Sequence, residues 1–223
     1  MALAASSNKS NHSWTSAFGR ACGVLLDTIV RWLALSRINP NVLTFMGLVV
    51  NTWAAILFGS ATALTQPRMF FYAGLVIIGS GFFDLVDGQV ARATNRVTRF
   101  GAFFDSVVDR YSDASQFLGL LVFYARGDRF FYVVLTAFVM VSAIMVSYTR
   151  ARAESLIGSC RVGFMERPER LVLVIIGALF NRMAPVLWVI AVLSTLTVIH
   201  RMRYTWTRTQ DGPNTAAKAG QAA

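Results

Sequence analysis

Five aspartates gather in one stretch of the chain whose flanks, "MFFYAGLVIIGSG" and "ASQFLGLLVFYA", are strongly apolar. They are Asp84, Asp87, Asp105, Asp109 and Asp113, and they make up five of the eleven acidic residues. A carboxylate buried in a membrane costs at least ~2.5 kcal/mol on the mildest insertion scale. Clustering adds mutual repulsion, so the pattern predicts a positive partner, and hard oxygen ligands suit Mg²⁺ or Mn²⁺.

Helical spacing directs four of these carboxylates toward one another. Asp84 and Asp87 are three residues apart, and Asp105 and Asp109 are four apart, so each pair shares a helix face. The basic turn "TNRVTR" joins the two segments, which makes the two helices antiparallel neighbours. Two metal ions in such a nest can hold phosphate oxygens and stabilise both attacking and leaving groups. We therefore expect phosphoryl-transfer chemistry here.

The aspartates could also serve two roles that need no metal. They can form structural ion pairs with Arg92, Arg99 and Arg110, or they can line the ion pathway of a membrane transporter. A transporter more naturally places its acids near the bilayer midplane and has related halves. Neither feature is evident in the sequence, so the metal site is favoured.

The composition predicts an all-α integral membrane protein. Of 223 residues, 55% are hydrophobic and 14% are charged, whereas soluble domains carry about 25% charged residues. The net charge of +10 is explained by arginines that flank membrane helices, and we expect no nucleic-acid partner. The two cysteines form no metal pattern, and the two histidines lie near the ends of the apolar region.

The chain divides into three parts. Residues 1–13 are expected to be disordered, 14–205 form the membrane domain, and 206–223 form a disordered tail. The domain begins with an amphipathic interfacial helix at 14–37. Six transmembrane helices follow, of which the fifth is short, at roughly 42–64, 69–92, 100–125, 129–152, 169–182 and 184–204.

The distribution of Lys and Arg predicts the orientation. Sixteen of them lie on one side of the predicted spans and four on the other. Cytoplasmic loops carry the excess of positive charge, so both termini should be cytoplasmic. The basic turn beside the aspartates belongs to the same side. The active site should therefore open to the cytoplasm, from the plasma membrane if the source is prokaryotic.

The aspartates belong to a longer pattern, Asp84-x2-Asp87-Gly88-x2-Ala91-Arg92-x8-Gly101-x3-Asp105-x3-Asp109. It resembles the signature of the CDP-alcohol phosphotransferases, also called class I CDP-alcohol phosphatidyltransferases, at every fixed position. The resemblance implies a reaction in which a CDP-linked lipid, usually CDP-diacylglycerol, donates its phosphatidyl group to an alcohol and CMP leaves. It also implies a homodimer.

The resemblance further implies roles for individual residues. Asp84, Asp87 and Asp105 would ligate two Mg²⁺ ions, for which Mn²⁺ can substitute, and Asp109 would be both a ligand and the catalytic base. The CDP headgroup would be held by Asn39, Pro40, Asn41, Val42, Gly88, Arg92 and Thr98. For the segment "NPNVLT", the alternative is a simple helix cap.

Three segments, "DSVVDRYSDA", "SYTRARAE" and "GFMERPERLVL", resemble the branch of the family that makes phosphatidylinositol phosphate or archaetidylinositol phosphate. Its acceptor is L-myo-inositol 1-phosphate. Arginine suits such an acceptor because its planar fork binds phosphate at two points. The candidates are Arg150, Arg152, Arg167, Arg170 and Arg201, with Arg152, Arg167 and Arg170 as first choices.

The acceptor has one close alternative. Glycerol 3-phosphate also carries a phosphate, and phosphatidylglycerophosphate synthases use it. Those relatives usually have Asp-Lys where this chain has Asp109-Arg110. The positive-inside rule alone also accounts for the arginines. Asp113 lies outside the signature, and pairing with an arginine and contact with inositol hydroxyls both stay open for it.

Overall fold

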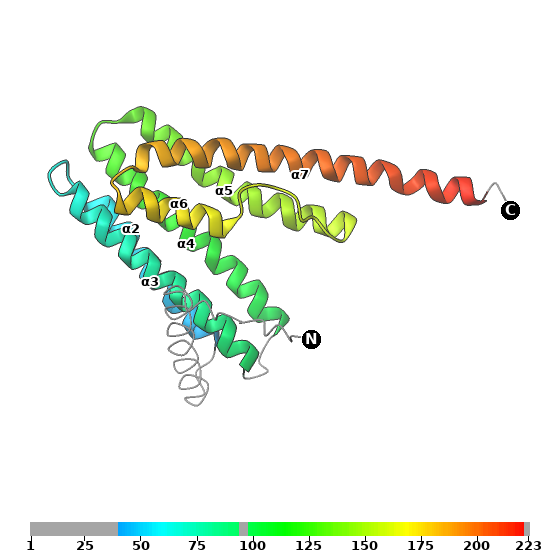
Figure 1. The fold of residues 1–223 in the computed structure, drawn as a ribbon, viewed down its shortest axis with the longest axis horizontal. Helices are drawn as coiled ribbons and strands as arrows, with labels where there is room; N and C mark the ends of the chain where they lie inside the picture. The colour runs from blue at the N-terminus through cyan, green and yellow to red at the C-terminus, as the bar shows by residue number, and fades with distance from the viewer. Residues whose placement is uncertain (1–39, 94–97, 221–223) are drawn as a thin grey trace, which may run out of the picture.

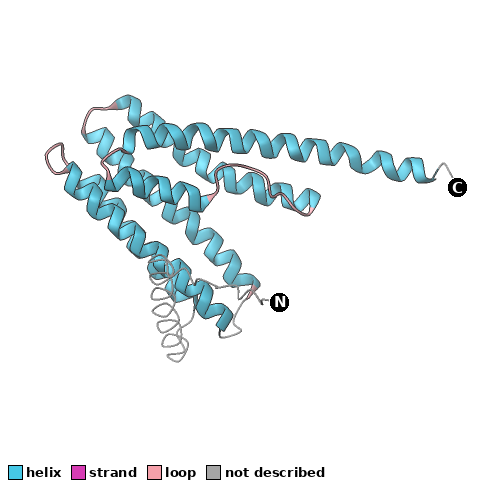
Figure 2. Cartoon of the chain, in the orientation of Figure 1, coloured by secondary structure: helices cyan, strands magenta, loops and turns pink. Residues whose placement is uncertain are grey.

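The computed structural model describes residues 40–93 and 98–220. In these ranges the chain is helical and contains no strand (Figures 1 and 2). The helices are α2 (Pro40–Ser60), α3 (Gln66–Ala93), α4 (Arg99–Arg126), α5 (Phe130–Ile157), α6 (Arg167–Leu179) and α7 (Met183–Gly220). The all-helical prediction is confirmed. The predicted disordered N-terminus and the interfacial helix at 14–37 lie outside the described residues.

Local sequence signals explain where the helices begin. Pro40 opens α2, a position where its missing N–H costs nothing. The Thr98 side chain caps α4 by accepting from the Gly101 N–H at 2.9 Å. At α6, Glu166 and Glu169 form a reciprocal capping box. The caps of α4 and α6 fix the helix ends that surround the candidate site.

Three of the described helices are long and apolar enough to cross a membrane, where the sequence predicts six spans. They are α2 over Asn41–Ser60, α5 over Phe130–Ile157 and α7 over Met183–Gln210. Helices α3 and α4 have 28 residues each but carry the aspartate cluster. Helix α6 has 13 residues, or about 20 Å, which is short of a hydrocarbon core of about 30 Å.

Helix α7 is the longest of the described helices, with 38 residues. Helix α7 continues to Gly220 and extends past the other helices (Figure 1). A helix that already exists propagates at low cost, whereas starting a new one is unfavourable. The helix continues as far as Gly220 into the segment that the sequence predicts to be a tail.

The helices form two groups around the site. Helix α2 packs on α3 and α4, α5 packs on α7 and α4, and α6 bridges α3 and α7. Phe70 of α3 makes edge-on ring contacts with Phe58 of α2 and Phe123 of α4. At Gly119, an added Cβ would lie 2.2 Å from the Ala55 carbonyl oxygen, so the backbones of α2 and α4 touch there.

A buried polar layer connects the same three helices below the aspartates. The Asn51 amide donates to Ser80 Oγ, and Gln116 donates to Asn51 Oδ1. Ser80 in turn donates to the Gly47 carbonyl at 3.2 Å. These bonds satisfy polar groups that would otherwise be costly to bury. They hold α2, α3 and α4 in register one turn away from Asp84.

Candidate active site

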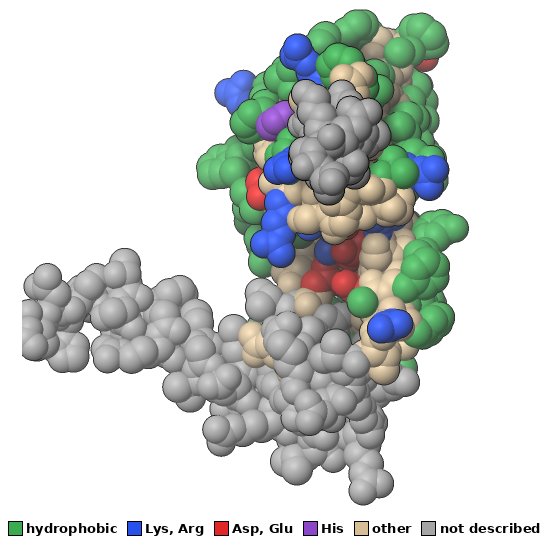
Figure 3. All heavy atoms as spheres, turned by 90° about the vertical axis from the view of Figure 1, so that its right-hand side faces the viewer, with side chains coloured by type: hydrophobic (Ala, Val, Ile, Leu, Met, Phe, Trp, Pro, Cys, Tyr) green, Lys and Arg blue, Asp and Glu red, His purple; other side chains and the backbone are tan. Residues whose placement is uncertain are grey.

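A pocket of about 670 Å³ opens at the end of the bundle where α4 and α6 begin and α5 ends. Acidic side chains lie in a hollow on this face of the molecule, with basic side chains beside them (Figure 3). The pocket is lined by Ala102, Asp105, Ser106, Asp109, Arg110, Asp113, Val146, Ser147, Arg150, Ala151, Glu154, Glu166, Arg167, Pro168, Arg170 and Arg201.

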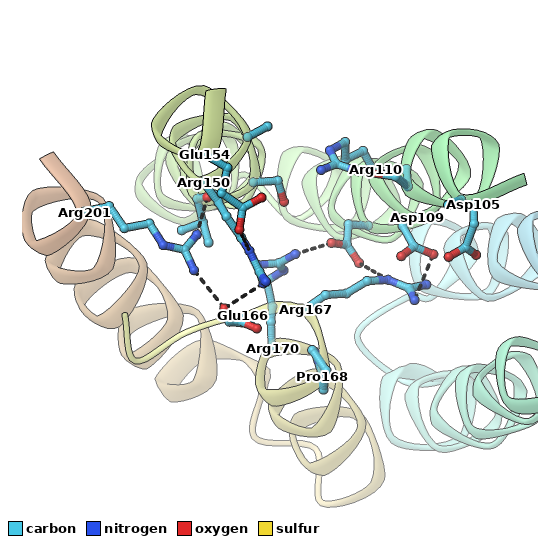
Figure 4. A pocket seen from close by; sticks show the side chains of 16 residues that line it. Asp105, Asp109, Arg110, Arg150, Glu154, Glu166, Arg167, Pro168, Arg170 and Arg201 are labelled. Carbon is cyan, nitrogen blue, oxygen red and sulfur yellow. Dashed lines mark hydrogen bonds and ion pairs between the residues drawn. The ribbon is translucent and has the colours of Figure 1, made fainter. Parts of the chain in front are cut away.

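The motif carboxylates converge on one cationic group. Arg167 Nη1 lies 2.8 Å from Asp84 Oδ2 and 2.9 Å from Asp109 Oδ1. Asp84 comes from α3, Asp109 from α4 and Arg167 from the start of α6. Asp105 lies one turn from Asp109, on the same side of α4 (Figure 4). The predicted meeting of carboxylates from two helices is present for these three aspartates.

The arginines that sequence reasoning offered as structural partners behave differently. Arg110 donates to the carbonyl and hydroxyl of Ser106 on its own helix. Within the described residues, neither Arg99 nor Arg110 forms an ion pair with an aspartate. The compensating charge comes from Arg167, which follows Asp84 by 83 positions in the sequence.

Part of the predicted nucleotide site is described. Asn41 at the start of α2 and Thr98 at the start of α4 lie together, because a Cβ added at Gly101 would approach both of their side chains within 3.5 Å. Val42 is exposed. The backbones of Pro40, Asp87, Gly88 and Arg92 are helical, but their side chains are not described, and Asn39 lies outside the described residues.

Asp113 acquires a definite partner. It accepts a hydrogen bond from Arg170 Nη2, and its other oxygen lies 3.9 Å from Arg167 Nε. Arg170 is 2% exposed. Its Nε and Nη1 are buried and find no hydrogen-bond partner among the described residues, a rare state for a buried donor. The pocket therefore contains a fixed cation with two unused donors.

A second carboxylate joins two more arginines on the other side of the pocket. Glu166 Oε1 accepts from Arg150 Nη1 at 3.0 Å and from Arg201 Nη2 at 2.9 Å (Figure 4). Arg150 also pairs with Glu154 at 3.1 Å. Arg201 is fully buried and also donates to the carbonyls of Val146 and Val162. Three helices, α5, α6 and α7, thus meet at Glu166.

The structure brings together four of the five candidate acceptor arginines and separates one, Arg152. Arg150, Arg167, Arg170 and Arg201 line the pocket. Arg152 lines a different cavity of about 300 Å³ between α5 and α7, with Tyr148 and Trp206. The reason is helical geometry, because residues two positions apart on a helix point about 200° apart. Sequence reasoning placed Arg152 among the first choices and did not place Arg150 or Arg201 there.

The motif carboxylates are the kind of oxygen donor that a divalent cation prefers, but in this structure they surround an arginine. Asp84 and Asp109 direct carboxylate oxygens at the same guanidinium nitrogen, and Asp105 lies beside them. Hard cations prefer such all-oxygen sites. Among described residues, no three acidic, histidine or cysteine side chains are close enough to hold an ion. A cation bound between Asp84 and Asp109 would have to displace Arg167.

Comparisons with known proteins identify the family of this chain. The model of the family "CDP-alcohol phosphatidyltransferase" matches residues 37–199. The archaetidylinositol phosphate synthase of Pyrococcus horikoshii is 36% identical over 179 residues, covering 79% of this chain and 88% of that protein. The phosphatidylinositol phosphate synthase of Mycobacterium tuberculosis is 35% identical over 205 residues, covering 86% and 88%.

Solved structures extend the similarity to the fold. A crystal structure of the M. tuberculosis synthase with CDP-DAG bound has a TM-score of 0.72 and 31% identity, covering 82% of this chain and 94% of that one. Another, in complex with manganese and citrate, has a TM-score of 0.70 and 32% identity, covering 82% and 89%. With its three apolar helices and its carboxylate site, this chain is an integral membrane enzyme that belongs to the CDP-alcohol phosphatidyltransferase family.

Proposed function

We propose that the enzyme transfers the phosphatidyl group of CDP-diacylglycerol, or of a related CDP-lipid, to a hydroxyl of L-myo-inositol 1-phosphate and releases CMP. The P. horikoshii and M. tuberculosis relatives are synthases of inositol phosphate lipids, and the latter was solved with CDP-DAG bound. The reaction belongs to phospholipid biosynthesis.

The observation that carries this proposal is the state of Arg170. A guanidinium in a residue that is only 2% exposed, with two unpaired nitrogens, is unfavourable unless an anion completes it. The CDP-lipid would supply its phosphates at the proposed nucleotide side, whereas Arg170 of α6 pairs with Asp113, one turn of α4 beyond Asp109. A phosphorylated acceptor fits this position better than serine or free inositol, which have no phosphate.

Negative and positive side chains lie on opposite sides of the pocket, as the proposed transfer requires. Asp105 and Asp109 lie at one side, and Arg150 and Arg201 lie at the other (Figure 4). An inositol phosphate that spans the pocket would put its phosphate among the arginines and a hydroxyl near Asp109. We therefore assign acceptor-phosphate binding to Arg150, Arg167, Arg170 and Arg201, and we no longer assign it to Arg152.

Asp109 is the proposed base. It takes the proton of the acceptor hydroxyl, which then attacks the phosphorus of the CDP-lipid while CMP leaves. Asp84, Asp87, Asp105 and Asp109 are proposed to hold two Mg²⁺ ions, which when bound supply charge stabilisation to the phosphate oxygens. A carboxylate base is effective only when the hydroxyl is held within hydrogen-bond reach. The arginines provide that positioning.

Nucleotide binding is assigned to the opposite side of the aspartates. Asn41 and Thr98 lie together there, and Asn39, Pro40, Val42, Gly88 and Arg92 complete the proposed set. Gly88 would leave room for the ligand to approach the helix backbone.

The proposal includes an arrangement in the membrane. We propose that α3, α4 and α6 lie within the bilayer with the three more apolar helices α2, α5 and α7, which gives six transmembrane helices behind an interfacial helix at 14–37. Both termini and the pocket would face the cytoplasm. The enzyme is proposed to be a homodimer in the plasma membrane if the source is prokaryotic.

One experiment tests the reaction and its acceptor. Purified protein is incubated with CDP-diacylglycerol, Mg²⁺ and inositol 1-phosphate, glycerol 3-phosphate, serine or free inositol, and CMP release is followed. We expect metal-dependent release with inositol 1-phosphate. Release with glycerol 3-phosphate alone would assign the enzyme to phosphatidylglycerophosphate synthesis. No release with any acceptor would contradict the proposed reaction.

A further inference from the structure

Helices α4 and α6 face each other with interleaved charges. Asp109 and Asp113 are four residues apart on α4, and Arg167 and Arg170 are three apart on α6. Each pair therefore lies on one helix face. Asp109 pairs with Arg167 at 2.9 Å, and Asp113 pairs with Arg170 one turn further on. The two ion pairs thus lie side by side between α4 and α6, one helical turn apart.

Asp113 also lies close to Arg167, the arginine of the first ion pair. Its Oδ1 lies 3.9 Å from Arg167 Nε, and its Oδ2 accepts from Arg170. A continuous row of alternating charges thus runs from Asp109 through Arg167 and Asp113 to Arg170. The row begins at the motif carboxylates and ends at Arg170, which has two buried donors without a partner among the described residues, whereas Arg167 has one. Asp113 is the only link between the two arginines that the described residues provide.

A purely structural role explains this arrangement poorly. A buried ion pair that serves stability needs its remaining donors satisfied, since desolvation otherwise exceeds the Coulomb gain. Asp113 is 7% exposed and pairs with one nitrogen of Arg170, while Nε and Nη1 find no partner among the described residues. The pair holds the guanidinium in place without saturating it. That is the property required of a group that positions a ligand-binding cation.

We infer that Asp113 is a positioning residue for the acceptor, and that it acts by orienting Arg170 toward the acceptor phosphate. The inference rests on the proposed function. It gives Asp113 a task distinct from that of the four motif aspartates, because Asp113 contacts neither the phosphate nor the reacting hydroxyl. Loss of its charge leaves Arg170 free to turn away, so the acceptor binds more weakly while the donor lipid does not.

The test is a double-mutant cycle of Asp113→Asn and Arg170→Gln, with steady-state kinetics for both substrates. We expect Asp113→Asn to raise the KM for inositol 1-phosphate by at least about 30-fold, the lower end of the cost of truncating one partner of a buried charge pair. The KM for CDP-diacylglycerol should stay within about twofold. Because Asp113 acts through Arg170, the double variant should be hardly worse than Arg170→Gln.

Two additions keep the result interpretable. The rise in melting temperature of each variant with inositol 1-phosphate or glycerol 3-phosphate measures acceptor binding without turnover. This measurement therefore tests the role of Asp113 even if the proposed reaction is wrong. Asp113→Glu keeps the charge and should retain more acceptor affinity than Asp113→Asn, which also covers the case in which the latter does not fold. Asp128→Asn, in the turn between α4 and α5, is the matched control.

Additive effects of the two substitutions, or equal losses for acceptor and donor, would overturn the positioning role even if wild-type protein releases CMP. Wild-type protein that releases no CMP but shows the non-additive loss of acceptor protection would overturn the proposed reaction and leave the positioning role intact.

Discussion

The Arg167 guanidinium lies 2.9 Å from the Asp109 carboxylate, and the same nitrogen lies 2.8 Å from Asp84. An arginine thus neutralises two of the carboxylates that we assign to divalent metal. Arginine keeps its charge at any ordinary pH. A metal ion bound by these oxygens would therefore compete with Arg167.

This competition predicts the behaviour of Arg167→Gln. Two unit charges about 4 Å apart interact by about 4 kcal/mol at an effective dielectric constant of 20. Even a fraction of that energy should raise Mn²⁺ affinity by about tenfold when the guanidinium is removed. Calorimetric titration of detergent-purified protein with Mn²⁺ measures the change. Arg110→Gln is the control, because Arg110 bonds to Ser106 on its own helix. Unchanged or weaker Mn²⁺ binding in Arg167→Gln would refute the competition.

The proposed base role makes a separate prediction. Asp109→Asn keeps the shape of the side chain but cannot accept a proton, so turnover should fall by at least the ~10²- to 10⁴-fold that general base catalysis contributes. The protein should stay folded, as judged by its detergent elution profile and melting curve. Asp128→Asn is again the matched control. An Asp109→Asn enzyme with near-normal CMP release would remove Asp109 from that role.

The sequence predicted the aspartate cluster well because spacing within a helix determines which residues share a face. Asp84 and Asp109 converge as their positions on α3 and α4 require. Spacing within one helix could not predict that Arg167 pairs with Asp84, since this contact depends on how α6 packs against α3. The length and apolar character of a segment likewise do not determine how many helices cross the bilayer.

Helical spacing within α5 separates Arg150 from Arg152, although the interpretation of the sequence preferred Arg152. Val146, Arg150 and Glu154 follow one another at intervals of four residues, so they share one face of α5. Glu154 one turn beyond Arg150 was a signal of that polar face. Arg201 carried no comparable signal, because its partner Glu166 lies 35 residues away.

The two arginines therefore provide a direct comparison. Arg150→Gln removes a cation that lines the pocket, and we expect the KM for inositol 1-phosphate to rise about tenfold, in line with the loss of one hydrogen bond to a charged group. Arg152→Gln removes the same charge from the same helix but from the other cavity. It should leave that KM within about twofold. A larger effect at Arg152 than at Arg150 would restore the assignment made from sequence.

Substitution of Gly47 tests how strongly kcat and Mn²⁺ affinity depend on the position of the Asp84 carboxylate. A Cβ added at Gly47 of α2 would lie 3.1 Å from Asp84 Oδ1, closer than ordinary van der Waals contact. Asp84 would have to move by a few tenths of an ångström, and small misplacements of catalytic groups cost rate steeply. Gly47→Ala should thus lower kcat and Mn²⁺ affinity by about three- to tenfold, an effect smaller than the ~10²-fold cost of a 1 Å misplacement.

Gly79→Ala is the control for this change. It makes the same substitution on α3, where the added methyl group meets no atom within 4 Å. Alanine favours helix over glycine by about 0.8–1.0 kcal/mol, so the melting temperature should hold or rise in this variant. Kinetics and Mn²⁺ titrations of the two proteins then separate helix propensity from the contact with Asp84. If both variants keep wild-type kcat and Mn²⁺ affinity, the Asp84 carboxylate tolerates displacement, and its position is not set by the close approach of α2.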